Sequence, residues 1–347
     1  MKVIHGMSEV AGQGIYSVQG LRANGVDANM AVWTRNPMNY PVDIDLGIDK
    51  TNKAKMPLGA LKMGLFALKA IFKYDVMHSH YGYSLLPFAL DAPFLSAMKK
   101  KLFTEFHGSE LRFIFKDIDY KYCRVGPPEE TIRIKMQNRL LKLLKHADGV
   151  ILHDAELVEH LPALDIPVYI VPLRVDLSKF DPVYPDRNNK KPVIVHAPSK
   201  RSTKGTEEIL EALKNVKWDY ELILVEGKTQ EEAIEIYKKA DIIIDQISVG
   251  TYGVFAIEAM ALGKPVITYI SDEIRETLPE ELPIVSADFD TLPEVICSLA
   301  EDSEKRFQLG VAGREYALRF HDNKRVADFL IKVYDGTIED NNLFKLL

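Results

Sequence analysis

Residues 240–268 read ADIIIDQISVGTYGVFAIEAMALGKPVIT. The isoleucines at 242–244 predict a buried strand, and a loop containing Gly250 and Gly253 leads from it into a short, almost wholly apolar helix. The Gly263-Lys-Pro sequence then ends the helix sharply. A strand, a glycine loop and a helix in this order form the repeating unit of parallel, doubly wound α/β sheets.

Glu258 is the only charged residue of the apolar helix. Burial of an ionised carboxylate is unfavourable unless it is paired, so we expect Glu258 to face an open cleft or a ligand with vicinal hydroxyls. At the start of the helix, Gly253, Val254 and Phe255 offer free backbone N–H groups and the positive end of the helix dipole, which together bind anions. The alternative is that the glycines only shape a turn and that Glu258 pairs with an arginine.

A basic segment precedes this unit. Residues 196–206, HAPSKRSTKGT, follow a predicted strand at 193–197 and carry Lys200, Arg201 and Lys204. Cations at the carboxyl end of a parallel strand are well placed to bind a diphosphate. A solvated loop of lysines is the alternative interpretation of the same residues.

Short β-rich runs alternate with longer amphipathic runs along the whole chain, which predicts two Rossmann-like α/β domains. The predicted strands are 3–4, 28–33, 76–77, 102–106, 149–152, 168–171, 193–197, 221–225, 242–245 and 265–268, and the predicted helices are 15–24, 57–72, 84–98, 129–146, 156–161, 206–213, 230–240, 254–262 and 323–334. The proline-rich stretch 179–192 predicts a linker between an N-terminal domain at 1–178 and a C-terminal domain at 193–320. We expect the last segment, 321–347, to pack back on the N-terminal domain.

Two loops of the first domain carry residue types suited to ligand binding. Gly12 and Gly14 follow the first predicted strand and permit close approach of a phosphate or a sugar. His107 follows another strand, where an imidazole can donate to a ligand oxygen or stabilise developing charge, the alternative being a structural histidine. His78 and His80 end a third strand, and we predict no metal there because no third ligand with zinc-like spacing follows.

Taken as a string, residues 253–266, GVFAIEAMALGKPV, resemble the signature helix of retaining GT-B glycosyltransferases, in particular family four, whose usual form is E-G-F-G-L-x-x-x-E-A-M-A-x-G-x-P-V. The resemblance implies a GT-B architecture, in which two Rossmann-like domains face each other across a cleft that holds a nucleotide-sugar donor. It also implies that Glu258 binds the ribose hydroxyls and that the amides of Gly253, Val254 and Phe255 bind the donor phosphates.

The basic segment resembles another element of the family, Arg-x4-Lys-Gly. Lys204 and the glycine after it match the end of this element, but Ser199 stands at the arginine position. The resemblance therefore implies that Lys204 binds the donor diphosphate and that the role of the arginine passes to Arg201 or Lys200.

The sugar contact of the family is altered in this chain. Gly250 stands where the signature has its first glutamate, the residue that contacts the donor hexose in the family. Asp245 and Gln246 stand where the family usually has Leu-Pro, and they are the nearest candidates to replace that contact. The sequence leaves open whether they do so, whether the sugar is held differently, or whether the chain binds a nucleotide without catalysis.

The first domain also matches the family. The His107-Gly-Ser-Glu sequence resembles a His-Gly-Ser-Asp-like element, and the stretch from Asp75 to His80 resembles an Asp-x-x-His-x-His element. The loop containing Gly12 and Gly14 corresponds to a glycine-rich loop that faces the donor phosphates and the acceptor in the family. These matches imply that His107 lines the reacting face of the site.

From the residues and the resemblance together, we predict a hexosyltransferase-type glycosyltransferase (EC 2.4 class) with His107, Lys204 and Arg201 as catalytic residues. It moves a sugar from a nucleotide-diphosphate-sugar donor to a glycan, lipid-linked or small-molecule acceptor, and the resemblance implies that it does so with retention. It needs no metal and no cofactor, because the helix dipole and basic side chains neutralise the leaving diphosphate. The alternatives are a non-catalytic nucleotide-sugar-binding protein and a sugar-nucleotide epimerase.

Composition narrows the partners and the compartment. The net charge of -6 over 347 residues gives no general attraction to nucleic acid. The two cysteines have no metal or disulfide spacing, and no signal-peptide pattern occurs, so we expect a cytoplasmic protein. Residues 55–73 form an amphipathic, lysine-bearing helix that could lie on the cytoplasmic face of a membrane, although packing on its own sheet is the favoured interpretation.

Overall fold

The computed structural model describes the whole chain except residues 36–39, 50, 118–126 and 347. The chain forms two compact units. The N-terminal unit contains the described residues of Met1–Ile118, Pro127–Arg174 and Asn323–Leu347, and the C-terminal unit contains those of Val175–Asp322. The boundary therefore falls at residues 174 and 175, and the predicted linker at 179–192 belongs to the C-terminal unit.

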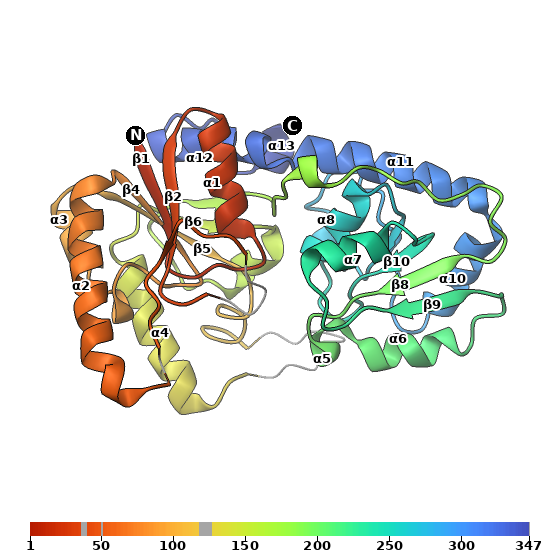
Figure 1. The fold of residues 1–347 in the computed structure, drawn as a ribbon, viewed down its shortest axis with the longest axis horizontal. Coiled ribbons are helices and arrows are strands. Elements are labelled where there is room, and N and C mark those ends of the chain that lie inside the picture. Colours follow the sequence, from red (N-terminus) through yellow and green to blue (C-terminus); the bar gives the residue numbers. More distant parts are fainter. Residues whose placement is uncertain (36–39, 50, 118–126, 347) are drawn as a thin grey trace. The chain divides into compact units, whose positions relative to one another are not determined.

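The N-terminal unit is built on a parallel seven-stranded sheet with the order β3-β2-β1-β4-β5-β6-β7 (Figure 1). Its strands are β1 (Lys2–Gly6), β2 (Asp27–Val32), β3 (Ile44–Asp45), β4 (Val76–His80), β5 (Lys101–Phe106), β6 (Gly149–Leu152) and β7 (Val168–Ile170). The sequence predicts each of these strands along the chain except the two-residue β3, which is too short to give a periodic signal. Because all strands run parallel, the residues that follow β1, β4 and β5 meet at one edge of the sheet.

Helices connect and cover these strands. They are α1 (Gln13–Ala23), α2 (Met56–Lys73), α3 (Ala92–Ala97), α4 (Glu130–Leu144), α12 (Asn323–Asp335) and α13 (Leu343–Leu346). Helix α12 returns from the far end of the chain and packs against α1. Gly20 allows this contact, because a Cβ at that position would overlap the backbone of Asn323.

The predicted helix at 84–98 forms only in part. A short 3-10 turn at Pro87–Ala89 precedes α3. The buried carboxylate of Asp91 accepts hydrogen bonds from the Ser84 hydroxyl and from the backbone N–H groups of Leu85 and Leu86. These bonds fold the chain back before α3, so a continuous helix cannot form.

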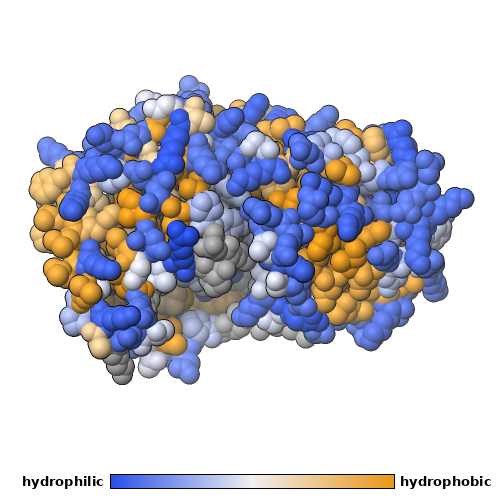
Figure 2. Space-filling model, viewed as in Figure 1, coloured by the Kyte–Doolittle hydropathy of each residue, from blue (hydrophilic) through white to orange (hydrophobic). Residues whose placement is uncertain are grey.

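Helix α2 differs from the favoured prediction. Its sheet-facing side consists of Gly59, Ala67, Ala70 and Ile71, which are buried. The apolar stripe of the helix lies in solvent instead. The stripe consists of Leu58, Leu61, Leu65, Leu68 and Phe72, which are 52% to 68% exposed. Small residues pack on the sheet because they allow close approach of the helix backbone, and the large side chains are left on the surface, where Figure 2 shows hydrophobic residues gathered over α2.

The C-terminal unit has a parallel four-stranded sheet with the order β11-β10-β8-β9. Its strands are β8 (Val193–His196), β9 (Glu221–Leu224), β10 (Ile242–Ile244) and β11 (Val266–Ile267). Its helices are α5 (Arg201–Lys204), α6 (Thr206–Leu213), α7 (Gln230–Tyr237), α8 (Val254–Ala261), α9 (Asp272–Arg275), α10 (Leu292–Glu301) and α11 (Ser303–Phe320). The core between the sheet and α6 and α10 contains Ile194, Ile242 and Ile244.

The stretch predicted as a linker is held by ordinary packing. Phe180 is buried, the N–H of Val183 donates to the carbonyl of Leu262, and Tyr184 lies against Gly263. Among the helices of the described residues, none combines the length and the apolar character needed to cross a bilayer.

Candidate functional site

Glu258 lies in the second turn of α8, the helix that follows β10 and its glycine loop. It is only 7% exposed. Its Oε1 accepts a hydrogen bond of 2.7 Å from the side-chain amide of Gln230, at the start of α7. Within the described part of the chain no arginine forms an ion pair with Glu258. The alternative prediction, a structural pair between Glu258 and an arginine, is therefore wrong for these residues.

The electrostatic state of Glu258 follows from this environment. Burial raises the pKa of Glu258 to about 7, and the hydrogen bond from Gln230 offsets only part of that effect. A neutral amide stabilises the ionised carboxylate less than a cation would. The side chain is therefore close to half-protonated at neutral pH and gains if a ligand supplies further hydrogen-bond donors.

A compact polar group lies at the N-terminus of α8. The ammonium of Lys204 is 2.6 Å from Asp245 Oδ1 and 3.0 Å from Gln246 Oε1. The other carboxylate oxygen of Asp245 accepts a hydrogen bond of 3.2 Å from the N–H of Gly253. The structure thus brings together the predicted site residues Lys204, Asp245, Gln246 and Gly253 at the start of α8, the helix that carries Glu258.

Asp245 changes what this helix end can bind. Its buried carboxylate sits where the sequence predicts an external anion, taking the Gly253 amide and the Lys204 charge for itself. The N–H groups of Val254 and Phe255, in the first turn, have no carbonyl partner within the helix. A phosphate at this point would share the helix end with Asp245 and compete for Lys204.

Gly250 has a structural reason to be glycine. Its φ of +88° is one that other residues rarely adopt, and a Cβ would lie 3.3 Å from that of Ser271. Its carbonyl accepts a hydrogen bond from the N–H of Ser271 at 2.9 Å. A glutamate could not replace it without strain, so the backbone path of this loop accounts for a glycine at this position of the signature.

The remaining basic candidates lie away from the α8 group. The guanidinium of Arg201 forms ion pairs with Glu207 and Glu226 at 2.8 and 3.1 Å, on the exposed side of the segment. Lys200 is exposed at the start of α5. Of the basic segment, the structure therefore brings Lys204 to Asp245 and holds Arg201 elsewhere.

The glycine loop of the N-terminal unit also contains an acid. The buried carboxylate of Glu9 accepts a hydrogen bond of 2.8 Å from the N–H of Ile15, in the first turn of α1. Burial raises the pKa of Glu9 to about 7, against hydrogen bonds from the backbone of Ile15, Gly14 and Gly12. Gly12 adopts a φ of +83°, and a Cβ on Gly14 would overlap Glu9 and Met30. The glycines thus admit a carboxylate of the chain itself where a ligand phosphate was predicted.

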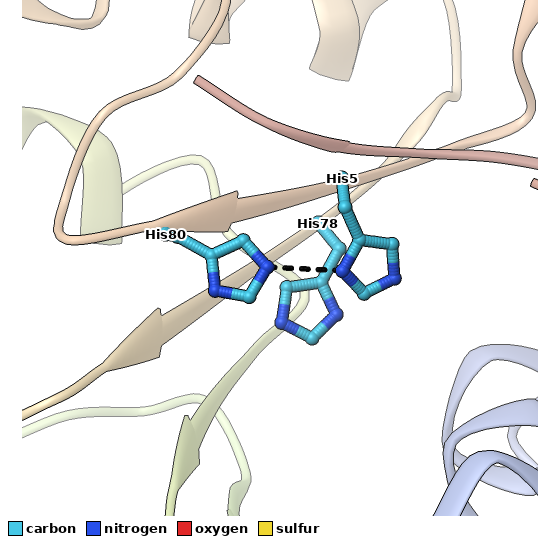
Figure 3. A group of neighbouring side chains, drawn as sticks. All are labelled: His5, His78 and His80. Carbon is cyan, nitrogen blue, oxygen red and sulfur yellow. Dashed lines mark hydrogen bonds between the residues drawn. The ribbon is translucent and has the colours of Figure 1, made fainter. Parts of the chain in front are cut away.

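Three buried histidines on neighbouring strands and a half-buried one that follows β5 form a group at the sheet edge of the N-terminal unit. We call His5, His78, His80 and His107 the histidine group. His5 Nδ1 is 3.0 Å from His80 Nε2, and His80 Nδ1 is 3.1 Å from His107 Nε2 (Figure 3 shows the first three residues). The rings of His5 and His78 stack with their centroids 4.2 Å apart.

Charged and phenolic groups complete this arrangement. Glu105 accepts hydrogen bonds from His78 Nε2 at 2.9 Å and from Arg174 at 2.5 Å. Burial alone would raise the pKa of Glu105, but the Arg174 guanidinium and the bond from His78 hold it well below its usual range. The hydroxyl of Tyr334, on α12, contacts His78 Nδ1 and lies 3.3 Å from His5 Nε2.

The imidazoles of the group are neutral at physiological pH. Burial lowers the pKa of His107 to about 3, and it also lowers the pKa values of His5, His78 and His80. A neutral His107 carries no charge with which to stabilise a leaving group, which was one of its predicted roles. Its Nδ1 is buried and has no hydrogen-bond partner in the described structure.

His5 supplies the third ligand that was missing from the sequence pattern at His78 and His80. The ligand atoms of these residues lie within 4.8 Å of one another. However, their ring nitrogens already contact each other, Glu105, Tyr334 or His107. Hydrogen bonding therefore accounts for the cluster without an ion.

His5, Glu9, Glu105, Arg174 and Tyr334 are site residues for which we predicted no role from the sequence. A usable signal existed for Glu105, a charge within the apolar run of β5, as for Glu258 in α8. Tyr334 and Arg174 reach the site from distant parts of the chain, and no local pattern marks them.

Solved structures share this fold. Sucrose-phosphate synthase from Thermosynechococcus elongatus is similar over 97% of this chain and 99% of its own, with a TM-score of 0.70 and 17% identity. A glycosyltransferase from Rickettsia africae ESF-5 is similar over 98% of this chain and 99% of its own, with a TM-score of 0.66 and 15% identity. HepE of Anabaena, in complex with UDP-glucose, is similar over 96% of this chain and 99% of its own, with a TM-score of 0.66 and 12% identity.

By sequence, no family model and no curated protein matches the chain. At these identities the structural similarity bears on the fold, and it extends over nearly the full length of both proteins. The predicted α/β fold class is confirmed: this chain has the GT-B fold of these glycosyltransferase structures.

Proposed function

We propose that this chain is a glycosyltransferase that uses a nucleotide-diphosphate-sugar donor and binds the nucleotide in its C-terminal unit. The observation that carries the proposal is Glu258, a buried carboxylate on α8 whose hydrogen-bond partner is a neutral amide. Two vicinal hydroxyls of a ribose supply the donors that such a carboxylate lacks. The structures of HepE in complex with UDP and with UDP-glucose support a donor of this class.

The donor diphosphate is proposed at the first turn of α8. The amides of Val254 and Phe255 and the ammonium of Lys204 are its binding groups, and Glu258 lies one turn further along the helix. Asp245 must share Lys204 with the phosphates. We propose that Asp245 and Gln246 also take over the sugar contact at which Gly250 replaces the family glutamate.

Retention of configuration, independence of metal and the catalytic part of His107 are further parts of the proposal. They rest on the resemblance of residues 253–266 and of the segment beginning at His107. The acceptor is a glycan, a lipid-linked group or a small molecule, all of which offer a hydroxyl as nucleophile.

Release of nucleoside diphosphate from a panel of nucleotide sugars tests the proposal. The wild type should release product from at least one donor, and Glu258→Ala and Lys204→Ala should each lower the rate at least tenfold. Lys214→Ala, which removes an exposed lysine paired with Glu211, is the matched control and should not change the rate. Nucleotide binding without release from any donor would favour the non-catalytic alternative, for which the Asp245–Lys204 pair is the structural argument.

We further propose that α2 docks on an anionic membrane surface. Its exposed stripe carries large apolar side chains. The helix sequence MPLGALKMGLFALKAIFK contains Lys62, Lys69 and Lys73 and no acidic residue. Apolar side chains with flanking cations suit the interface of a bilayer with anionic headgroups. Such docking would bring the enzyme to a lipid-linked acceptor.

A further inference from the structure

The hydrogen bonds of the histidine group form one continuous series from Glu105 to His107. Glu105 contacts His78, His78 contacts Tyr334, and Tyr334 contacts His5. His5 then contacts His80, and His80 contacts His107. A neutral imidazole has one donor and one acceptor nitrogen, so the protonation of each ring constrains the next.

Glu105 sets the direction of the series. Arg174 keeps its carboxylate ionised, so this carboxylate only accepts hydrogen bonds. Neutral His78 must therefore donate to Glu105 through Nε2, which leaves its Nδ1 as an acceptor. The hydroxyl of Tyr334 then donates to His78, and the phenolic oxygen is free to accept from His5 Nε2.

The same logic continues to the end of the series. With its proton on Nε2, His5 accepts at Nδ1 from His80 Nε2. His80 in turn accepts at Nδ1 from His107 Nε2. The remaining atom, His107 Nδ1, is then an unprotonated acceptor, and it is the atom that has no partner in the described structure.

We propose that Tyr334 is a positioning residue that polarises this series, so that His107 presents an unprotonated Nδ1 as its free end. In the opposite direction, His5 Nε2 and the phenolic oxygen of Tyr334 would face each other as two acceptors while Tyr334 donates to His78. One buried hydrogen bond would then be lost, which is unfavourable. Tyr334 is the only link between His78 and His5 in the series.

Without Tyr334 the opposite direction would win. His80 Nδ1 lies 3.6 Å from the ionised Glu105 Oε2, which favours a proton on that nitrogen. A proton there would turn the bond between His80 and His107 around and place a proton on His107 Nδ1. The hydroxyl of Tyr334 therefore opposes the effect of the Glu105 charge on the position of these protons. Its removal should place a proton on His107 Nδ1.

The polarity determines which ligand group His107 can bind. An unprotonated Nδ1 accepts from a hydroxyl or an N–H group and cannot donate to a phosphate oxygen. This consequence rests on the proposed function: in a transferase, a sugar hydroxyl that reaches His107 Nδ1 can donate to it, whereas the diphosphate cannot pair with it.

Two-bond proton–nitrogen correlation spectra of the ligand-free protein test the proposal. They distinguish protonated from unprotonated ring nitrogens, and the His107 signals are assigned by their loss in His107→Gln. We expect Nδ1 of His107 to be unprotonated and Nε2 protonated at pH 7. A protonated Nδ1 would overturn the proposal, whatever the protein does with nucleotide sugars.

Tyr334→Phe tests the residue itself. The variant should show a protonated Nδ1 population of His107 that the wild type lacks. Tyr169→Phe is the matched control, since Tyr169 also packs on Phe103, as Tyr334 does, but lies outside the series. An unchanged His107 spectrum in Tyr334→Phe would remove Tyr334 from the account, and if that variant does not fold, the wild-type spectrum still decides the polarity.

Discussion

Glu258 combines deep burial with a partner that carries no charge. Its pKa of about 7 means that the ligand-free protein holds this proton across a pH range in which an exposed glutamate is ionised. In the proposed complex, ribose hydroxyls would donate to the ionised form and lower that pKa. Nucleotide binding should therefore release a proton near neutral pH and tighten as the pH rises through 7.

The pKa of Glu258 also predicts a pH dependence of stability. The folded state keeps the proton between the ordinary value of 4.5 and about 7, so the contribution of this residue to stability is complete below 4.5 and falls as the pH rises through 7. The shift corresponds to about 3 kcal/mol. As the pH rises across this range, the free energy of unfolding of Glu258→Gln should increase relative to that of the wild type. Glu235→Gln should show no such trend. A constant difference between Glu258→Gln and the wild type would contradict the assignment.

The charge of Asp245 should weaken the binding of nucleoside diphosphates. Its carboxylate lies beside the proposed phosphate position and neutralises Lys204. Asp245→Asn removes this negative charge, so nucleoside diphosphates should bind about tenfold more tightly at low salt, equivalent to about 1.4 kcal/mol. Titration calorimetry with UDP, GDP and ADP measures the change. Weaker binding of all three would mean that Asp245 helps to hold the ligand instead of opposing it.

Side-chain pairing explains which site residues the sequence could predict. Glu258 was predictable because one charge in an apolar helix stands out, and Lys204 because a cation follows a strand end. The roles of Glu9 and Asp245 as occupants of helix ends were not, because an acid before a helix looks the same in sequence whether it faces the amides or the solvent.

At the scale of elements, α2 presents its larger apolar side chains to solvent and its smaller ones to the sheet. Periodicity located this helix to within one residue at each end. It could not tell which apolar residues are buried, because the small residues of the buried side and the larger residues of the exposed stripe are all apolar. An exposed apolar stripe such as the one from Leu58 to Phe72 is typical of a surface that binds a partner or a membrane.

Replacement of the stripe tests the membrane proposal. Leu61→Gln/Leu65→Gln should fold normally, because both leucines are more than half exposed. Its binding to vesicles of anionic phospholipid should fall at least tenfold in a co-sedimentation assay, since a fully buried leucine contributes roughly 1.5–3 kcal/mol. Leu318→Gln, at an exposed leucine of α11, is the control. Equal sedimentation of both variants and the wild type would count against docking through α2.

The whole molecule consists of two parallel-sheet units, and the N-terminal unit contains sequence from both before and after the C-terminal unit. The alternation of strands and helices was enough to predict this fold class. The crossing point was not predictable, because the proline-rich stretch after residue 178 packs as ordinary structure and the chain leaves the N-terminal unit earlier, at Arg174. Its return at Asn323 closes the N-terminal unit with a helix from the far end of the sequence.

Glycine substitutions test this closure. In Gly20→Ala the new methyl group would overlap Asn323 and Ala327, so the free energy of unfolding should fall by about 1–3 kcal/mol. Gly64→Ala is the matched substitution in an exposed helix position with no atom within 4 Å, and it should raise stability by about 0.5–1 kcal/mol. Thermal unfolding of both variants measures the contrast. Similar effects of the two substitutions would show that α12 does not depend on close contact with α1.

Titration calorimetry of the wild type, Glu258→Gln and Glu235→Gln with nucleotide sugars, at a pH above 7, decides whether Glu258 binds the nucleotide. Glu235 is an exposed glutamate on α7 paired with Lys238, so its replacement controls for the loss of one carboxylate. We expect the wild type and Glu235→Gln to bind at least one donor equally, and Glu258→Gln to bind it at least tenfold more weakly. Equal affinity of all three proteins, or no binding by the wild type, would contradict this expectation.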